Sequence, residues 1–163
     1  MRVVLITLLT ATALLSACDP QRIEKLEEGL ATESDVRKQF GDAPQIIEHA
    51  DGSKTMAYPR QPQGWTNYEI VIGSDGKMRS LRQLLTPANF AKVQPGMAQD
   101  EVRKLLGKHA KTLSYAMKPT EEVWQWRFMS GQDKKVFEVT FDRDHSVIVT
   151  HTADDEKASL PGG

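Results

Sequence analysis

The sequence predicts an α+β fold with two tandem repeats, each made of two short helices followed by an antiparallel β-meander. Three observations lead to this prediction. A short motif occurs twice, helix-start signals accompany both copies, and alternating apolar segments separated by glycine-containing turns follow each copy. Because the helices come first and the strands follow in a run, we expect an antiparallel sheet rather than the parallel sheet of a βαβ protein.

The repeated motif determines the predicted domain organisation. The first copy, residues 29–41, reads GLATESDVRKQFG, and the second, residues 96–107, reads GMAQDEVRKLLG. Aligned on Val-Arg-Lys, with one residue more in the first copy, the copies share Gly, Ala, Val, Arg, Lys and the final Gly. An internal repeat of this kind predicts two similar structural units. The predicted segments are a signal at 1–17, repeats at 18–85 and 86–152, and a flexible tail at 153–163.

Two helices are expected at the start of the first repeat. Asp19-Pro20 predicts a helix start, because aspartate caps a helix and proline fits its first position. A second helix follows Thr32, which can form a capping box with Asp35. Gly41 is expected to end that helix, because glycine tolerates the left-handed backbone found beyond helix ends.

The second repeat shows the same order with weaker signals. Thr86-Pro87 predicts a short helix, and Gly107 ends the helix after it. Ala98 stands where the first repeat has Thr32, so this helix start is expected to be weaker. Across both repeats the expected strands are 45–49, 54–58, 66–72, 77–84, 111–117, 123–129, 135–141 and 146–152. Trp124, Trp126 and Phe128 alternate along one of them and are expected to face the core.

The N-terminal residues have the features of an export signal. A positive start is followed by Val3–Leu15, which carries no charge, and Leu15-Ser16-Ala17-Cys18 resembles a bacterial lipobox. The uncharged run is shorter than the ~20 residues that a membrane-spanning helix needs. In lipobox proteins the cysteine sulfur receives a diacylglycerol. Cys18 is the only cysteine, and we expect it to be the lipidated first residue of the mature chain.

Composition and motifs argue against several classes of function. A formal net charge of −1 gives no electrostatic reason to expect a nucleic-acid partner. No serine-hydrolase, zinc-protease, phosphate-loop or dinucleotide motif occurs, so we expect no enzyme activity, no cofactor and no small-molecule substrate. His145 and His151 could share a strand face, but the spacing supplies no third ligand, and no metal site is expected.

The two motif copies and the lipobox resemble the BamE (SmpA/OmlA) family of outer-membrane assembly lipoproteins. The resemblance covers about residues 23–152, with Tyr58 and Trp126 at the aromatic strand positions. It implies a BamE/β-lactamase-inhibitor-like fold in each repeat. Two departures from the family pattern are evident. This chain carries two copies instead of one, and neither Gly41-Asp42-Ala43-Pro44 nor Gly107-Lys108-His109-Ala110 keeps the family's Gly-x-Pro spacing.

The resemblance implies a non-enzymatic adaptor or scaffold in outer-membrane protein assembly or cell-envelope maintenance. Its expected partners are the membrane, through lipid on Cys18, and envelope proteins such as barrel-assembly components. The expected location is the cell envelope, facing the periplasm. The outer membrane is favoured, and Asp19 leaves the inner membrane open. The alternative is a periplasmic enzyme inhibitor or ligand-binding module of the β-lactamase-inhibitor type.

Two aromatic residues are candidates for partner contact. Tyr58 and Trp65 border a proline-containing loop between two expected strands. Tryptophan and tyrosine are enriched at the centres of protein interfaces. Trp65 could equally be packed against the domain, and the sequence leaves both possibilities open.

Overall fold

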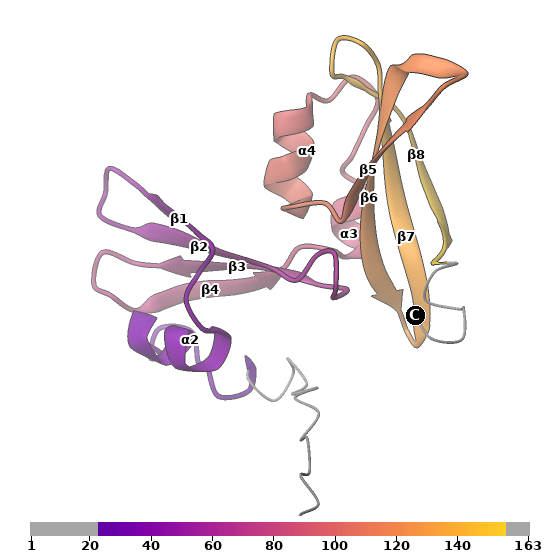
Figure 1. The fold of residues 1–163 in the computed structure, drawn as a ribbon. Coiled ribbons are helices and arrows are strands. Elements are labelled where there is room, and N and C mark those ends of the chain that lie inside the picture. The colour runs from indigo at the N-terminus through magenta and orange to yellow at the C-terminus, as the bar shows by residue number, and fades with distance from the viewer. Residues whose placement is uncertain (1–22, 156–163) are drawn as a thin grey trace, which may run out of the picture.

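The computed structural model describes residues 23–155. The predicted signal, the lipobox and Cys18 lie outside this range, as does most of the predicted tail. The described chain forms two four-stranded antiparallel sheets, each with its strands in sequence order (Figure 1).

The first sheet is formed by residues 45–83. Adjacent strands pair antiparallel, and Gly52, with a φ of 79°, supplies the left-handed position in the turn between the first two. A longer loop, residues 60–66, joins the second strand to the third. The register places Met56 and Ile70 on one face and Ala57 and Glu69 on the other. The strands are β1 (Gln45–Glu48), β2 (Lys54–Pro59), β3 (Asn67–Ile72) and β4 (Met78–Gln83).

The second sheet is larger, because its two central strands are longer. Successive antiparallel pairing aligns Trp124 with Val139 and Trp126 with Phe137 across these strands. Alternation then directs these aromatic side chains to one face, as the sequence predicts. The strands are β5 (Lys111–Tyr115), β6 (Lys118–Ser130), β7 (Asp133–Phe141) and β8 (Val147–Asp154).

Three short helices are named in the described range: α2 (Glu33–Phe40), α3 (Pro87–Phe90) and α4 (Gln99–Leu106). Thr32 and Asp35 form the expected capping box at the start of α2. Ala98 has no side-chain acceptor for the first turn of α4, as expected from the missing hydroxyl, and the Ala98 N–H donates to Glu101 Oε2 at 2.9 Å. Glycine follows both eight-residue helices, with a positive φ at Gly41 and Gly107.

Each sheet has its own apolar core. Val36 and Phe40 of α2 pack on the inner face of the first sheet, against Met56, Tyr58 and neighbouring residues. The second core consists of buried side chains from α3 and the residues on either side of it, from α4 and from the inner face of the second sheet: Leu85, Phe90, Val93, Val102, Leu106, Trp124, Trp126, Phe128, Phe137, Val139, Phe141 and Val147. The core position expected for the three alternating aromatic residues of β6 is confirmed.

The predicted fold class is wrong. The described chain is mostly β, with two four-stranded antiparallel sheets and only a few short helices, and is not a pair of tandem helix-plus-meander repeats. Cap and glycine signals mark where a helix starts and stops, but they leave room here for only one or two turns. The longest element is a strand, β6, with 13 residues, whereas the longest described helices have eight.

The individual strand positions are largely confirmed. All eight expected strands are present, with ends that differ by a few residues. The largest difference is β6, which begins at Lys118 rather than at Val123. At the other end of the chain, β8 continues to Asp154, past the predicted end of the second repeat.

Candidate functional site

A groove of about 590 Å³ lies between the outer face of the first sheet and α4. Its volume is within the range of about 300–1,000 Å³ that is usual for ligand pockets. Figure 1 shows α4 in the angle between the two sheets, while α2 covers the opposite face of the first sheet. The groove is therefore built from both halves of the chain.

The floor of the groove is the uncovered face of the first sheet. Gln45, Ala57 and Glu69 form one row across β1, β2 and β3, and Ile47 lies opposite Thr55 in a neighbouring row. Ile47 is 48% exposed, although it lies within a strand. The floor thus offers apolar surface next to a few polar groups, which is typical of binding clefts.

The wall of the groove is basic. Arg103 and Lys104 come from α4, and Lys108 comes from the loop that follows it. All three are exposed. Two carboxylates also line the groove, Asp100 at the start of α4 and Glu69 on the floor. Cations therefore dominate on the α4 side.

His109 lies where this wall meets the second core. Its ring stacks on Trp124 at a centroid distance of 4.4 Å, with 18° between the planes, and Arg103 lies over the same tryptophan at 4.6 Å. The Nε2 atom of His109 lies 2.9 Å from Thr112 Oγ1, within hydrogen-bond distance. Burial, followed by the charge of Arg103, lowers the pKa of His109 below its ordinary 6.5. Both effects favour the neutral form of the imidazole beside the basic wall.

Asn67 fastens the floor of the groove to its wall. Its side chain is 1% exposed, and Nδ2 donates to the carbonyl oxygens of Leu106 and Lys108 at 2.7 and 2.8 Å. Gly107 lies between these two carbonyls, and a Cβ there would approach Asn67 Nδ2 to 3.1 Å. A side chain at residue 107 would also be strained, because its φ is +70°. The close approach explains why glycine ends α4.

Gln61 makes a second connection between the halves. β5 begins its pairing with β6 at Gln125, so the outer edge of β6 has no strand beside it at Arg127. Gln61 fills this place: its Nε2 donates to Arg127 O at 2.8 Å, and Arg127 N–H donates to Gln61 Oε1 at 3.1 Å. One carboxamide therefore satisfies both main-chain groups, as a neighbouring strand would.

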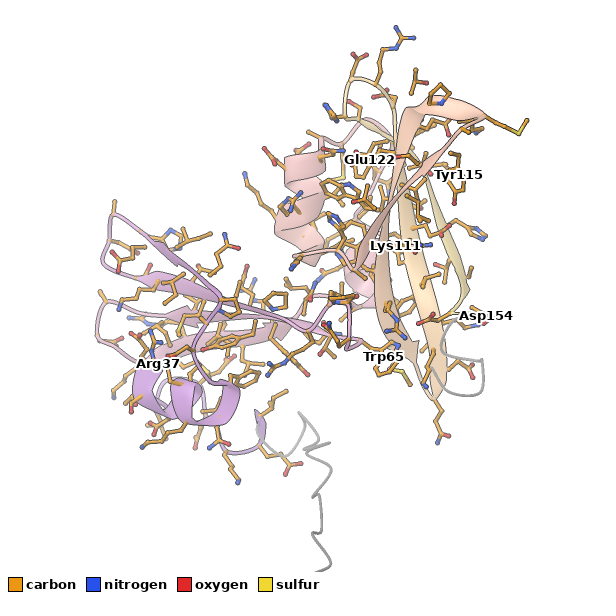
Figure 2. All side chains as sticks on the ribbon, in the orientation of Figure 1. Arg37, Trp65, Lys111, Tyr115, Glu122 and Asp154 are labelled. Carbon is orange, nitrogen blue, oxygen red and sulfur yellow. The ribbon has the colours of Figure 1, made fainter. Side chains whose placement is uncertain are left out.

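The predicted contact residues lie in different surroundings. Tyr58 is 1% exposed, and its hydroxyl donates to Gly41 O, so its side chain belongs to the first core. Trp65 is partly buried against the second sheet, with Arg127 at 4.7 Å and Lys134 at 5.1 Å from its ring (Figure 2). Contact of Trp65 with a partner stays a prediction, and Tyr58 has almost no surface to offer one.

Sequence reasoning missed the groove residues. The basic side chains of α4 lie within the second motif copy, where the sequence shows only a charged helix face. The signal that could have found the connection is Asn67, a polar residue at the start of a mostly apolar strand. A buried polar side chain requires a hydrogen-bond partner, which here lies in the other half of the chain.

Residues 23–155 were compared with the requirements of a metal site and of a membrane-spanning helix. No group of three His, Cys, Asp or Glu side chains in this range is arranged to hold a metal ion. No helix in it is long and apolar enough to cross a membrane. The lipid attachment predicted at Cys18 lies outside this range.

Comparisons with known proteins give structural likenesses at low scores. No family model matches the chain, and no curated protein matches it. Among solved structures, an osmotically inducible lipoprotein, OsmE, is similar with 21% identity and a TM-score of 0.38. The match covers 46% of this chain and 79% of that one.

Two further similar structures come from Bacillus. A DUF4309 family protein (YjgB) of Bacillus subtilis has 15% identity and a TM-score of 0.34, with 83% of this chain and 86% of that one covered. An extracellular protein with an SCP domain from Bacillus anthracis has 13% identity and a TM-score of 0.30, with 84% and 46% covered. Scores this low establish neither a shared fold nor a shared function.

Proposed function

We propose that the chain is a lipid-anchored protein of the bacterial cell envelope that acts by binding other envelope proteins, without catalysis. The observation that carries this proposal is the sequence Leu15-Ser16-Ala17-Cys18 after an uncharged apolar segment, in a chain with no other cysteine. Two or more acyl chains on that cysteine would give a stable anchor. The finer proposal is the role implied by the BamE resemblance, in outer-membrane protein assembly or envelope maintenance.

The groove between the first sheet and α4 supports a binding role. The groove is open to solvent. Charged and apolar side chains from the two halves, each with its own core, line it. Asn67 and Gln61 hold the halves together through hydrogen bonds from their side-chain amides to main-chain carbonyls of the other half. A preorganised cleft of this kind loses little conformational entropy when it binds a partner. A membrane anchor would also raise its effective concentration near other envelope proteins.

In-cell photocrosslinking tests the adaptor role. A photoreactive phenylalanine analogue replaces Thr55 on the groove floor and, as a control, Arg143 in the exposed turn between β7 and β8. We expect the Thr55 probe to crosslink discrete envelope proteins, identifiable by mass spectrometry, and the Arg143 probe to yield none of them. Identical products from both positions, or no product from Thr55, would contradict an adaptor that uses the groove.

The same experiment addresses the inhibitor alternative, which the groove also favours because a cleft of this size can receive an enzyme loop. An inhibitor would yield a secreted enzyme as the main crosslinked product, and that enzyme would lose activity when the purified chain is added. An adaptor would yield membrane-associated assembly components and leave their activities intact.

A further inference from the structure

We infer that the groove between the first sheet and α4 binds an extended peptide segment whose side chains alternate between acidic and apolar. This inference rests on the proposed function, because it specifies the chemistry of the partner segment that an adaptor would hold. The site is defined by its floor, with Ile47 and Ala57, and its wall, with Arg103, Lys104 and Lys108.

The shape of the groove favours an extended chain over a compact ligand. The floor crosses three strands, from Gln45 on β1 to Glu69 on β3, so it is a surface rather than a pit. An extended peptide rises about 3.3 Å per residue and directs successive side chains to opposite sides. One set of side chains would lie on the floor while the other faces the wall.

The chemistry of the two surfaces sets the preferred sequence. Ile47, Ala57 and Pro59 give the floor apolar patches that favour small or branched apolar side chains. The three cations of the wall are exposed, and no described side chain forms an ion pair with Lys104 or Lys108. Carboxylates of a bound peptide would complement these charges.

The acidic residues of the groove do not remove this complementarity. Glu69 lies on the floor opposite Arg82 of β4, so a cation is its neighbour in register. Asp100 lies at the start of α4, in the first turn, where the helix dipole favours a negative charge. The part of the wall formed by the end of α4 and the loop after it therefore keeps a net positive charge.

Fluorescence anisotropy with defined peptides tests the inference. The probe is a fluorescein-labelled peptide of alternating glutamate and valine, compared with a peptide in which glutamine replaces every glutamate. The protein is the full chain in detergent. We expect the glutamate peptide to bind at least tenfold more tightly than the glutamine peptide, with the advantage shrinking as salt rises.

Charge reversal locates the binding. Lys104→Glu with Lys108→Glu should raise the Kd of the glutamate peptide at least tenfold. Both side chains are exposed, and neither forms an ion pair with a described side chain. The matched control is Lys92→Glu with Arg143→Glu, which changes the net charge equally at exposed positions outside the groove. We expect the control to change the Kd less than threefold.

Three outcomes would overturn the inference: no binding of the glutamate peptide at millimolar concentration, equal binding of both peptides, or equal effects of the two charge reversals. Each of these leaves the in-cell crosslinks from Thr55 unaffected, so the adaptor proposal could stand while the peptide chemistry fails. Loss of the crosslinks with peptide binding retained would instead contradict the adaptor role.

Discussion

At the scale of single residues, Asn67 connects the two halves of the chain through its side chain. It is almost fully buried at the start of β3, and its amide nitrogen bonds two carbonyls at the end of α4. Its Oδ1 atom is buried and has no hydrogen-bond partner among the described residues. An unsatisfied buried acceptor costs about 1–3 kcal/mol, so the two donated bonds must outweigh this cost.

Replacing the amide of Asn67 by a carboxylate tests this role. Asn67→Asp keeps the shape of the side chain but places an oxygen against the carbonyls of Leu106 and Lys108. We expect the free energy of unfolding to fall by roughly 2–4 kcal/mol, because two hydrogen bonds are replaced by repulsion. Chemical denaturation measures this, with Gln132→Glu at an exposed turn as the control. A loss as small as that of the control would contradict the role.

His109 makes stability depend on pH. Its pKa in the folded chain lies below the ordinary 6.5, mainly because the ring is buried, and the nearby Arg103 charge lowers it further. The unfolded chain therefore takes up a proton at His109 before the folded chain does. The contribution of His109 to the free energy of unfolding is fully present above about pH 7. It declines as the pH falls through 6.5 towards the lower pKa that His109 has in the folded chain.

The His109→Gln variant should therefore lose less stability than the wild type between pH 7.5 and 5.5. The carboxyl groups with lowered pKa values, such as Glu33 and Asp75, titrate below this interval and leave the comparison unaffected. Urea denaturation at the two pH values measures the difference. Parallel losses in both proteins would show that protonation of His109 is not linked to folding.

At the scale of elements, the caps of the two eight-residue helices form a natural comparison. Thr32 accepts a hydrogen bond from the Asp35 main chain, whereas Ala98 has no side-chain acceptor. Thr32→Ala should cost about 1 kcal/mol of stability, and Ala98→Ser should add up to about 1 kcal/mol. Thermal and urea denaturation of both variants check the opposite signs. A gain from Thr32→Ala, or a loss from Ala98→Ser, would refute the capping account.

The strands could be predicted from the sequence, but the fold class and the groove could not. Strands were predictable because turns such as Asp51-Gly52 and Asp75-Gly76 punctuate alternating apolar residues. The fold class was not, because caps locate helix ends without fixing how much of the chain the helices occupy. The groove was not predictable either. Its floor and wall are far apart in the sequence, and they meet only through bonds such as Asn67 to Leu106.

At the scale of the whole molecule, Gln61 tests whether the halves form one unit. Gln61→Ala would leave the N–H and C=O of Arg127 without their present partner. We expect hydrogen exchange at the Arg127 amide to quicken about five- to tenfold, because one hydrogen bond contributes about 1–1.5 kcal/mol. Gln63→Ala, an exposed residue of the same loop, is the control. Unchanged protection at Arg127 would show that the connection is not made as described.

The proposed anchor places this two-part groove beside a membrane, and detergent phase partitioning tests it most directly. After expression with its signal, the wild-type chain should enter the detergent phase, and Cys18→Ser should move it to the aqueous phase. The Lys104→Glu and Lys108→Glu variant retains Cys18 and should partition as the wild type does. Equal partitioning of the wild type and Cys18→Ser would contradict lipid anchoring at this cysteine.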